Sequence, residues 1–162
     1  THLNPWQGAP ISATDFRDQR SQFARERIEA TRDAQMISSW AGKGGAGKSS
    51  LSLITAETAG EAGLRVLLID ANRGQSSIRR NLKVTREQFP SVNDVPRQGA
   101  RASVVSADLI NQRRPAARGT LHFDLLLAPP DDLAGPVHTP AASYMQALSD
   151  LRSEYDLIVI DT

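Results

Sequence analysis

A glycine-rich segment followed by a lysine and a serine carries the clearest chemistry in the chain. Residues Gly42 to Ser49 read Gly-Lys-Gly-Gly-Ala-Gly-Lys-Ser and fit the pattern GxxxxGK[ST], which binds nucleotide phosphates. Glycines let the backbone approach an anion closely, so that several N–H groups converge on it. We expect Lys48 to bridge the β- and γ-phosphates and the Ser49 hydroxyl to ligate Mg²⁺. The predicted nucleotide-binding residues are Gly42, Lys43, Gly44, Gly45, Ala46, Gly47, Lys48, Ser49 and Ser50.

This segment stands between a predicted strand and a predicted helix. The mostly apolar run 34–41 predicts the strand, and 48–62 predicts the helix, with Leu51, Ile54 and Ala59 on its buried side. A helix that begins at such a loop directs its free N–H groups and partial positive charge at the bound anion. The order strand, loop, helix therefore supports the phosphate-binding interpretation.

Three more apolar runs predict buried strands, over 65–70, 122–128 and 156–161. Helices are expected over 76–82, 93–98, 106–112 and 140–155. Because strands alternate with helices and their apolar runs are continuous, the sequence favours a mostly parallel sheet covered on both faces. We expect a three-layer α/β/α fold over 34–162, preceded by an N-terminal extension, 1–33, that contains one helix from about 14 to 33.

Composition and charge exclude several classes of function. The 162 residues include no cysteine, so a thiolate metal site, a cysteine nucleophile and a cysteine-ligated iron–sulfur cluster are excluded. No apolar run reaches the length of a membrane span, and a cytoplasmic protein is expected. The net charge is only +1, but the stretch 73–118 is strongly basic. It is either a surface for an anionic partner such as DNA or an ordinary solvated surface.

With Lys43 included, the loop resembles the deviant Walker A motif, KGGxGK[ST], of the ParA/MinD family of P-loop ATPases, which position DNA, division sites and other cargo. In that family the early lysine reaches across an ATP-bound dimer to the partner's phosphates, and the resemblance implies this role for Lys43. It also implies ATP and Mg²⁺ as cofactors, an ATP-dependent homodimer, and a cargo or activating protein as partner.

Two strand ends resemble the same family. The segment RVLLID at 65–70, followed by ANRGQS, is similar to its second strand and switch I, which implies that Asp70 lies near Mg²⁺ and its waters. The segment YDLIVIDT at 155–162 resembles its Walker B strand, which implies that Asp161 holds a Mg²⁺-bound water. The implied metal residues are thus Ser49, Asp70 and Asp161. Since the family continues past this strand, we expect a P-loop NTPase domain that is incomplete at its C-terminal end.

Asn72 departs from the family pattern. Many members carry a second acid two residues after the first one in switch I, where it helps to activate the attacking water. An amide orients water by hydrogen bonding, but it cannot accept a proton as a carboxylate does. Slow ATP hydrolysis is therefore expected, with Lys43, Lys48, Asp70 and Asn72 as the catalytic residues.

Two functions remain open for such a switch. The first is a slow ATPase in DNA segregation or cargo positioning, which needs the basic stretch to form one face of the dimer. The second is an ATP-binding scaffold or localisation protein of a secretion or pilus system with little or no hydrolysis, which Asn72 favours. A membrane-bound positioner and an autophosphorylating tyrosine kinase fit less well, the latter because Tyr144 and Tyr155 are the chain's only tyrosines.

Overall fold

The computed structural model describes residues 33–39, 47–72, 77–84, 88–115, 117, 119–130 and 140–162. Almost all of the extension expected over 1–33, with its helix, lies outside these ranges. Positions 40–46, which include most of the glycine-rich loop, lie outside them as well. The division into an extension and a domain therefore stays a prediction.

The described strands form one parallel sheet. They are β1 (Gln35–Ser39), β2 (Val66–Asp70), β3 (Asp124–Leu126) and β4 (Leu157–Asp161), and they lie in the order β1-β4-β2-β3. All three pairs of neighbouring strands are parallel. The four predicted strands are confirmed, each somewhat shorter than its apolar run. The parallel arrangement follows from the helical segments that carry the chain back between successive strands.

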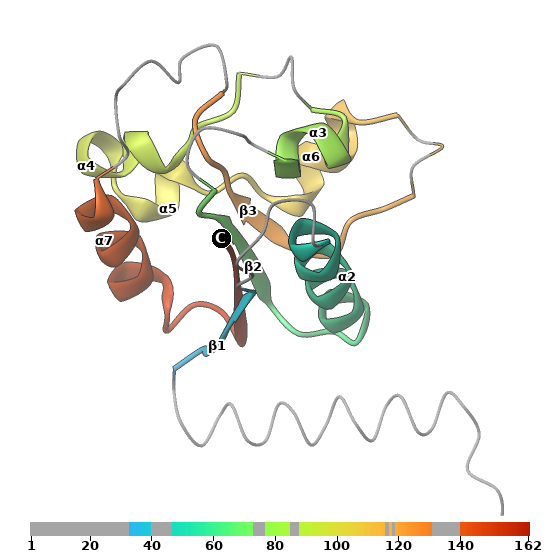
Figure 1. Cartoon of the computed structure of the whole chain (residues 1–162), viewed down its shortest axis with the longest axis horizontal. Helices are drawn as coiled ribbons and strands as arrows, with labels where there is room; N and C mark the ends of the chain where they lie inside the picture. The colour runs from blue at the N-terminus through green and yellow to red at the C-terminus, as the bar shows by residue number, and fades with distance from the viewer. Residues whose placement is uncertain are drawn as a thin grey trace, which may run out of the picture.

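Helices lie on both faces of this sheet (Figure 1). On one face are α2 (Lys48–Glu61), α3 (Ser77–Leu82) and α6 (Ala107–Arg113). The other face is covered by the 3₁₀ turn η1 (Val92–Asp94), α4 (Val95–Gln98), α5 (Ala100–Ser103) and α7 (Ala141–Leu151). The three-layer α/β/α prediction is confirmed, although α5 was not predicted and α7 ends before the expected 155.

Two hydrophobic cores hold the layers together, and β2 supplies both. All five of its residues are buried. Val66 and Leu68 pack into the core under α2, α3 and α6. Leu67 and Ile69 point to the opposite face and pack into the core under α4, α5 and α7. Because successive side chains of a strand alternate between faces, a strand covered on both sides has to be apolar throughout.

The expected buried side of α2 is partly wrong. Leu51 and Ile54 are exposed by 60% and 63%, whereas Ala59 is partly buried against the core as expected. The fully buried residues of this helix are Ser52 and Ala56. These two positions are one turn apart and face the sheet, so the helix is rotated away from the orientation that its largest apolar residues suggest.

In the described part of the chain, β1 pairs with β4 alone and has an open second edge. Its Met36 and Ile37 are exposed by 58% and 48%. None of the described helices is long and apolar enough to cross a membrane.

Candidate functional site

Three neighbouring strands end in polar residues that lie in one row. Ser39 of β1 is the register partner of Asp161 in β4, and Asp161 is in turn the partner of Asp70 in β2. Both aspartates are fully buried. The carboxyl ends of parallel strands are where ligands bind in open α/β sheets. The sheet thus brings the two carboxylates implied by the resemblance to one place, although the strands that carry them are far apart in sequence.

Helix α2 begins directly after Gly47, the last glycine of the motif. Gly47, the residue before the helix, has φ 77° and ψ 13°, a left-handed conformation that glycine adopts without strain. The first helical hydrogen bond runs from the Leu51 N–H to the Gly47 carbonyl at 2.9 Å. By helix geometry, the N–H groups of residues 48–50 have no acceptor within the helix and are available to an anion. Lys48 and Ser49 open the helix as predicted, while Gly42 to Ala46, and with them Lys43, lie outside the described residues.

Asp161 is held by two serines. The Ser52 hydroxyl donates to Asp161 Oδ1 at 3.1 Å, and the Ser39 hydroxyl lies 2.8 Å from the Ser52 hydroxyl and 3.4 Å from the same Oδ1. The second carboxylate oxygen, Oδ2, is buried and has no hydrogen-bond partner among the described residues. A buried carboxylate oxygen without a donor is costly unless a cation or a water binds it.

Asp70 is fixed by its own loop. Its Oδ1 accepts a hydrogen bond of 3.1 Å from the Asn72 N–H, and its carbonyl accepts one of 3.2 Å from the Tyr144 hydroxyl of α7. The Ala71 N–H donates to the carbonyl of Asp161 at 2.8 Å, which joins this loop to the end of β4. Asn72 therefore lies directly beside Asp70, where the resemblance puts the residue that handles water.

Ser49 contacts a residue that the sequence did not single out. Its hydroxyl oxygen lies 2.6 Å from that of Ser77, the first residue of α3. Ser39, Ser52, Ser77 and Tyr144 were all missed as site residues. Serine and tyrosine are common in every kind of segment, so nothing in their sequence spacing marked them. A serine on the sheet-facing stripe of α2 is a signal, but it requires the orientation of that helix to be known.

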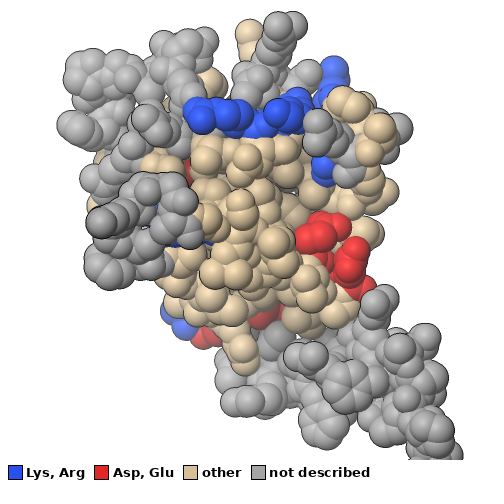
Figure 2. Space-filling model, turned by 45° about the vertical axis from the view of Figure 1, so that its right-hand side comes forward, with Lys and Arg blue, Asp and Glu red and all other residues tan. Residues whose placement is uncertain are grey.

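The basic stretch 73–118 is not uniformly available to a partner. Arg79, which belongs to this stretch, is buried: its guanidinium donates to the carbonyls of Ala128 and Phe89 at 3.2 and 3.3 Å. Two others pair with acids, Arg97 with Asp94 and Arg101 with Glu154. In the view of Figure 2, Lys and Arg side chains gather along the upper edge, above a broad uncharged surface, and acidic ones gather lower down.

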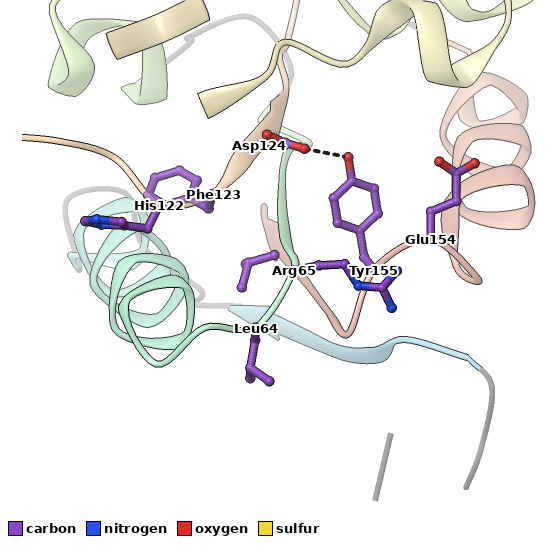
Figure 3. A pocket seen from close by; sticks show the side chains of 8 residues that line it. Leu64, Arg65, His122, Phe123, Asp124, Glu154 and Tyr155 are labelled. Atoms are coloured by element: carbon purple, nitrogen blue, oxygen red, sulfur yellow. Dashed lines mark hydrogen bonds between the residues drawn. The ribbon is translucent and has the colours of Figure 1, made fainter. Parts of the chain in front are cut away.

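A hollow of about 450 Å³ lies at the opposite end of the sheet, where β2, β3 and β4 begin (Figure 3). The Tyr155 hydroxyl points across it to Asp124 and donates to Oδ2 at 2.9 Å. His122 lies at its rim and contacts Glu57 of α2, with 2.8 Å between Nδ1 and Oε1. None of the described residues that the motif predicts, Gly47 to Ser50, lines this hollow, which lies at the end of the sheet away from Asp70 and Asp161.

Comparison with known proteins bears on the fold. No protein-family model and no curated protein sequence matches the chain. Cobyrinic acid a,c-diamide synthase from Mycobacterium smegmatis, solved with an ATP analogue and magnesium, matches with a TM-score of 0.60 and 24% identity, over 79% of this chain and 49% of that one. The cell division ATPase MinD from Pyrococcus furiosus matches with a TM-score of 0.55 and 17% identity, over 79% of this chain and 49% of that one.

A third solved structure covers almost the whole chain. The chimerical protein CapA2B2 matches with a TM-score of 0.58 and 18% identity, over 98% of this chain and 63% of that one. The chain thus spans about half the length of the first two structures and less than two thirds of the third. The chain therefore has the same α/β fold as these three structures, one of which is the ATPase MinD, and this agrees with the fold that its sequence predicts.

Proposed function

We propose that the chain binds ATP with Mg²⁺ and acts as an ATP-dependent dimerising switch of the ParA/MinD type with slow ATPase activity. One observation carries the proposal: α2, which opens with Lys48 and Ser49, contacts the row of strand ends that holds Asp70 and Asp161, through the bond from Ser52 to Asp161. The helix that begins with the proposed phosphate-binding lysine and hydroxyl is thus joined to the carboxyl end of the sheet, where the two carboxylates lie side by side. Positioning and electrostatics are most of what phosphoryl transfer needs from a protein.

The residues present fit a magnesium ion. Mg²⁺ prefers hard oxygen ligands and usually keeps several waters. Ser49 offers a hydroxyl oxygen, Asp70 and Asp161 offer carboxylates, and Asp161 Oδ2 is buried with no partner in the described part of the chain. When bound, the ion would neutralise charge on the phosphates. In the proposal, Ser49 and Asp161 hold the ion and its water, and Asp70 lies beside its waters.

The remaining roles rest on the motif. Lys48 and the backbone N–H groups from Gly42 to Gly47 and of Ser50 bind the phosphates, and Lys43 reaches the nucleotide of the partner subunit. Asn72 orients the attacking water without accepting its proton, which makes turnover slow. The M. smegmatis structure, with its ATP analogue and magnesium, supports the choice of ligand.

Binding of a fluorescent ATP analogue to the purified chain tests this function. We expect saturable binding that strengthens with Mg²⁺ and is lost in Lys48→Gln, since the phosphates then lose their cation. Lys83→Gln is the matched control, because it removes an exposed lysine outside the site. Size analysis with and without ATP tests the dimer. Wild-type protein that binds no nucleotide would overturn the proposal.

Two uses of the switch make different predictions. As a DNA-segregation ATPase in the cytoplasm, the chain would bind nonspecific DNA only with ATP and less tightly as salt rises. The basic edge in Figure 2 favours this use. As a scaffold or localisation protein of a secretion or pilus system, it would bind ATP and hardly release phosphate, which Asn72 beside Asp70 favours. Phosphate release at a healthy rate, abolished in Lys48→Gln, would reject the scaffold.

A further inference from the structure

The two oxygens of the Asp161 carboxylate differ in their surroundings. Oδ1 accepts a hydrogen bond from Ser52 at 3.1 Å and lies 3.4 Å from the Ser39 hydroxyl. Oδ2 is equally buried, yet has no partner among the described residues. The protein therefore holds one oxygen of the carboxylate, and the other oxygen is left without a hydrogen-bond donor from the described residues.

Both serine hydroxyls reach the same carboxylate oxygen. Ser52 donates to Asp161 Oδ1 at 3.1 Å, and Ser39 donates to it over a longer distance, 3.4 Å. The two hydroxyl oxygens are themselves 2.8 Å apart, and either can be the donor in that contact. The result is a cluster of hydrogen-bonding groups around Oδ1. Its members come from three elements, β1, α2 and β4.

Ser52 occupies a position that packing alone would fill with an apolar residue. It is 1% exposed and lies on the same stripe of α2 as Ala56, whose side chain belongs to the hydrophobic core. A buried hydroxyl stabilises a fold little on its own and needs a partner to offset its desolvation. Here its partner is the carboxylate of a proposed metal residue.

We propose that Ser52, supported by Ser39, is a positioning residue that fixes the Asp161 carboxylate with Oδ2 free for the magnesium ion and its water. This inference rests on the proposed function and extends it to residues outside the phosphate-binding motif. Without the Ser52 hydroxyl, the Asp161 carboxylate rotates or binds a water molecule instead. The magnesium ion then has to order the carboxylate when it binds. Groups that orient a metal residue in this way typically change metal affinity by about 10- to 100-fold.

The test measures affinity for a fluorescent ADP analogue across a Mg²⁺ titration and again with the metal chelated. Mg²⁺ is expected to strengthen nucleotide binding, and the Mg²⁺ concentration that gives half of this increase should be about tenfold higher in Ser52→Ala than in the wild type. The affinity for the nucleotide in the presence of a metal chelator should be the same in both proteins. Ser39→Ala should give a shift in the same direction but smaller, because Ser39 lies farther from Asp161 Oδ1, at 3.4 Å, than Ser52 does, at 3.1 Å. In an Asp161→Asn background, Ser52→Ala should produce no further shift, which a merely structural role would not predict.

Ser143→Ala is the matched control. Ser143 is a buried serine of α7 whose hydroxyl has no hydrogen-bond partner in the described part of the chain. Loss of this hydroxyl should change neither the Mg²⁺ requirement nor the nucleotide affinity in the presence of chelator. Two results would overturn the positioning role and leave nucleotide binding by the wild type intact. One is a folded Ser52→Ala protein whose Mg²⁺ requirement is unchanged. The other is a Ser52→Ala protein that loses nucleotide affinity equally with and without the metal. If Ser52→Ala does not fold, Ser39→Ala decides by the same criteria. Absence of nucleotide binding by the wild type overturns the proposed function and this inference together.

Discussion

The hydroxyl oxygens of Ser49 and Ser77 lie 2.6 Å apart and join the first turn of α2 to the first residue of α3. α3 follows the loop that begins after β2 and contains Asn72. The contact therefore links the proposed phosphate-binding helix to the residue that directly follows the segment resembling switch I. A hydroxyl oxygen keeps a lone pair for a cation while its hydrogen is donated elsewhere, so Ser77 can orient Ser49 without competing with the ion.

Removing this contact should weaken the magnesium-dependent part of nucleotide binding. In Ser77→Ala the Ser49 hydroxyl loses the group that orients it, and we expect a Mg²⁺ requirement about three- to tenfold higher. Fluorescence titration with and without the metal measures the effect. Ser153→Ala, an exposed serine at the opposite end of the sheet, should behave as wild type. An unchanged requirement in Ser77→Ala would show that the contact does not orient Ser49.

Gly47→Ala should cost stability through the backbone and not through crowding. Gly47 has φ 77°, and a Cβ there would meet nothing within 4 Å. The left-handed conformation costs a non-glycine residue about 1–2 kcal/mol, which urea unfolding should detect. Gly119→Ala is the matched control, since Gly119 has φ 72° and equally open surroundings. We expect both variants to be destabilised to a similar extent, but only Gly47→Ala to lose affinity for the nucleotide. Equal nucleotide affinity in the two variants would contradict the proposed role of Gly47 in phosphate binding.

Most of the sheet was predictable because β2, β3 and β4 are largely buried on both faces. Such strands are continuous apolar runs, and two of them end in Asp70 and Asp161, whose alignment follows from parallel pairing at one edge. The orientation of α2 was not predictable in the same way. Its sheet-facing stripe begins with Ser52, which satisfies a carboxylate 109 positions further along the chain, and a hydrophobic pattern cannot reveal that partner.

Arg79 illustrates the same limit for charge. In the sequence it stands beside Arg80 in a basic stretch and is typical of a solvated surface. In the structure its guanidinium is inside and donates to the carbonyls of Phe89 and Ala128, which are 10 and 49 positions away. Burial of an arginine depends on acceptors that only the tertiary fold brings together. Counting charges along the chain therefore overstated the basic surface.

Asn72→Asp should accelerate hydrolysis. Asn72 lies directly beside Asp70, its N–H donating to Asp70 Oδ1 at 3.1 Å. A carboxylate at this position can accept a proton from the attacking water, which an amide cannot. We expect phosphate release to rise by about tenfold or more, measured at saturating ATP and Mg²⁺. Addition of Lys48→Gln should abolish the gain. An unchanged rate in Asn72→Asp, with nucleotide affinity intact, would show that proton acceptance at this position does not limit turnover.

Gly60→Ala should destabilise the fold despite the higher helix propensity of alanine. A Cβ at Gly60 would lie 2.1 Å from the carbonyl oxygen of His122, so the backbone before β3 would have to move away from α2. Alanine gains up to about 1 kcal/mol over glycine inside a helix. Overpacking typically costs about 1–3 kcal/mol, and here the obstacle is backbone, so the loss should prevail. Urea unfolding measures the net effect, with Thr58→Ala on the exposed side of α2 as control. A Gly60→Ala protein more stable than wild type would contradict the close approach.

Tyr155 should make the fold sensitive to alkaline pH. Burial raises the pKa of its hydroxyl, and the charge and hydrogen bond of Asp124 raise it further. A tyrosine whose pKa is higher in the folded state contributes stability below its unfolded pKa of about 10 and loses that contribution as the pH rises further. The free energy of unfolding should therefore fall between about pH 9 and about pH 11. Tyr155→Phe, which has no hydroxyl to ionise, should be less stable at neutral pH and lose less stability over this range. An identical alkaline loss in Tyr155→Phe and wild type would show that Tyr155 is not the group responsible.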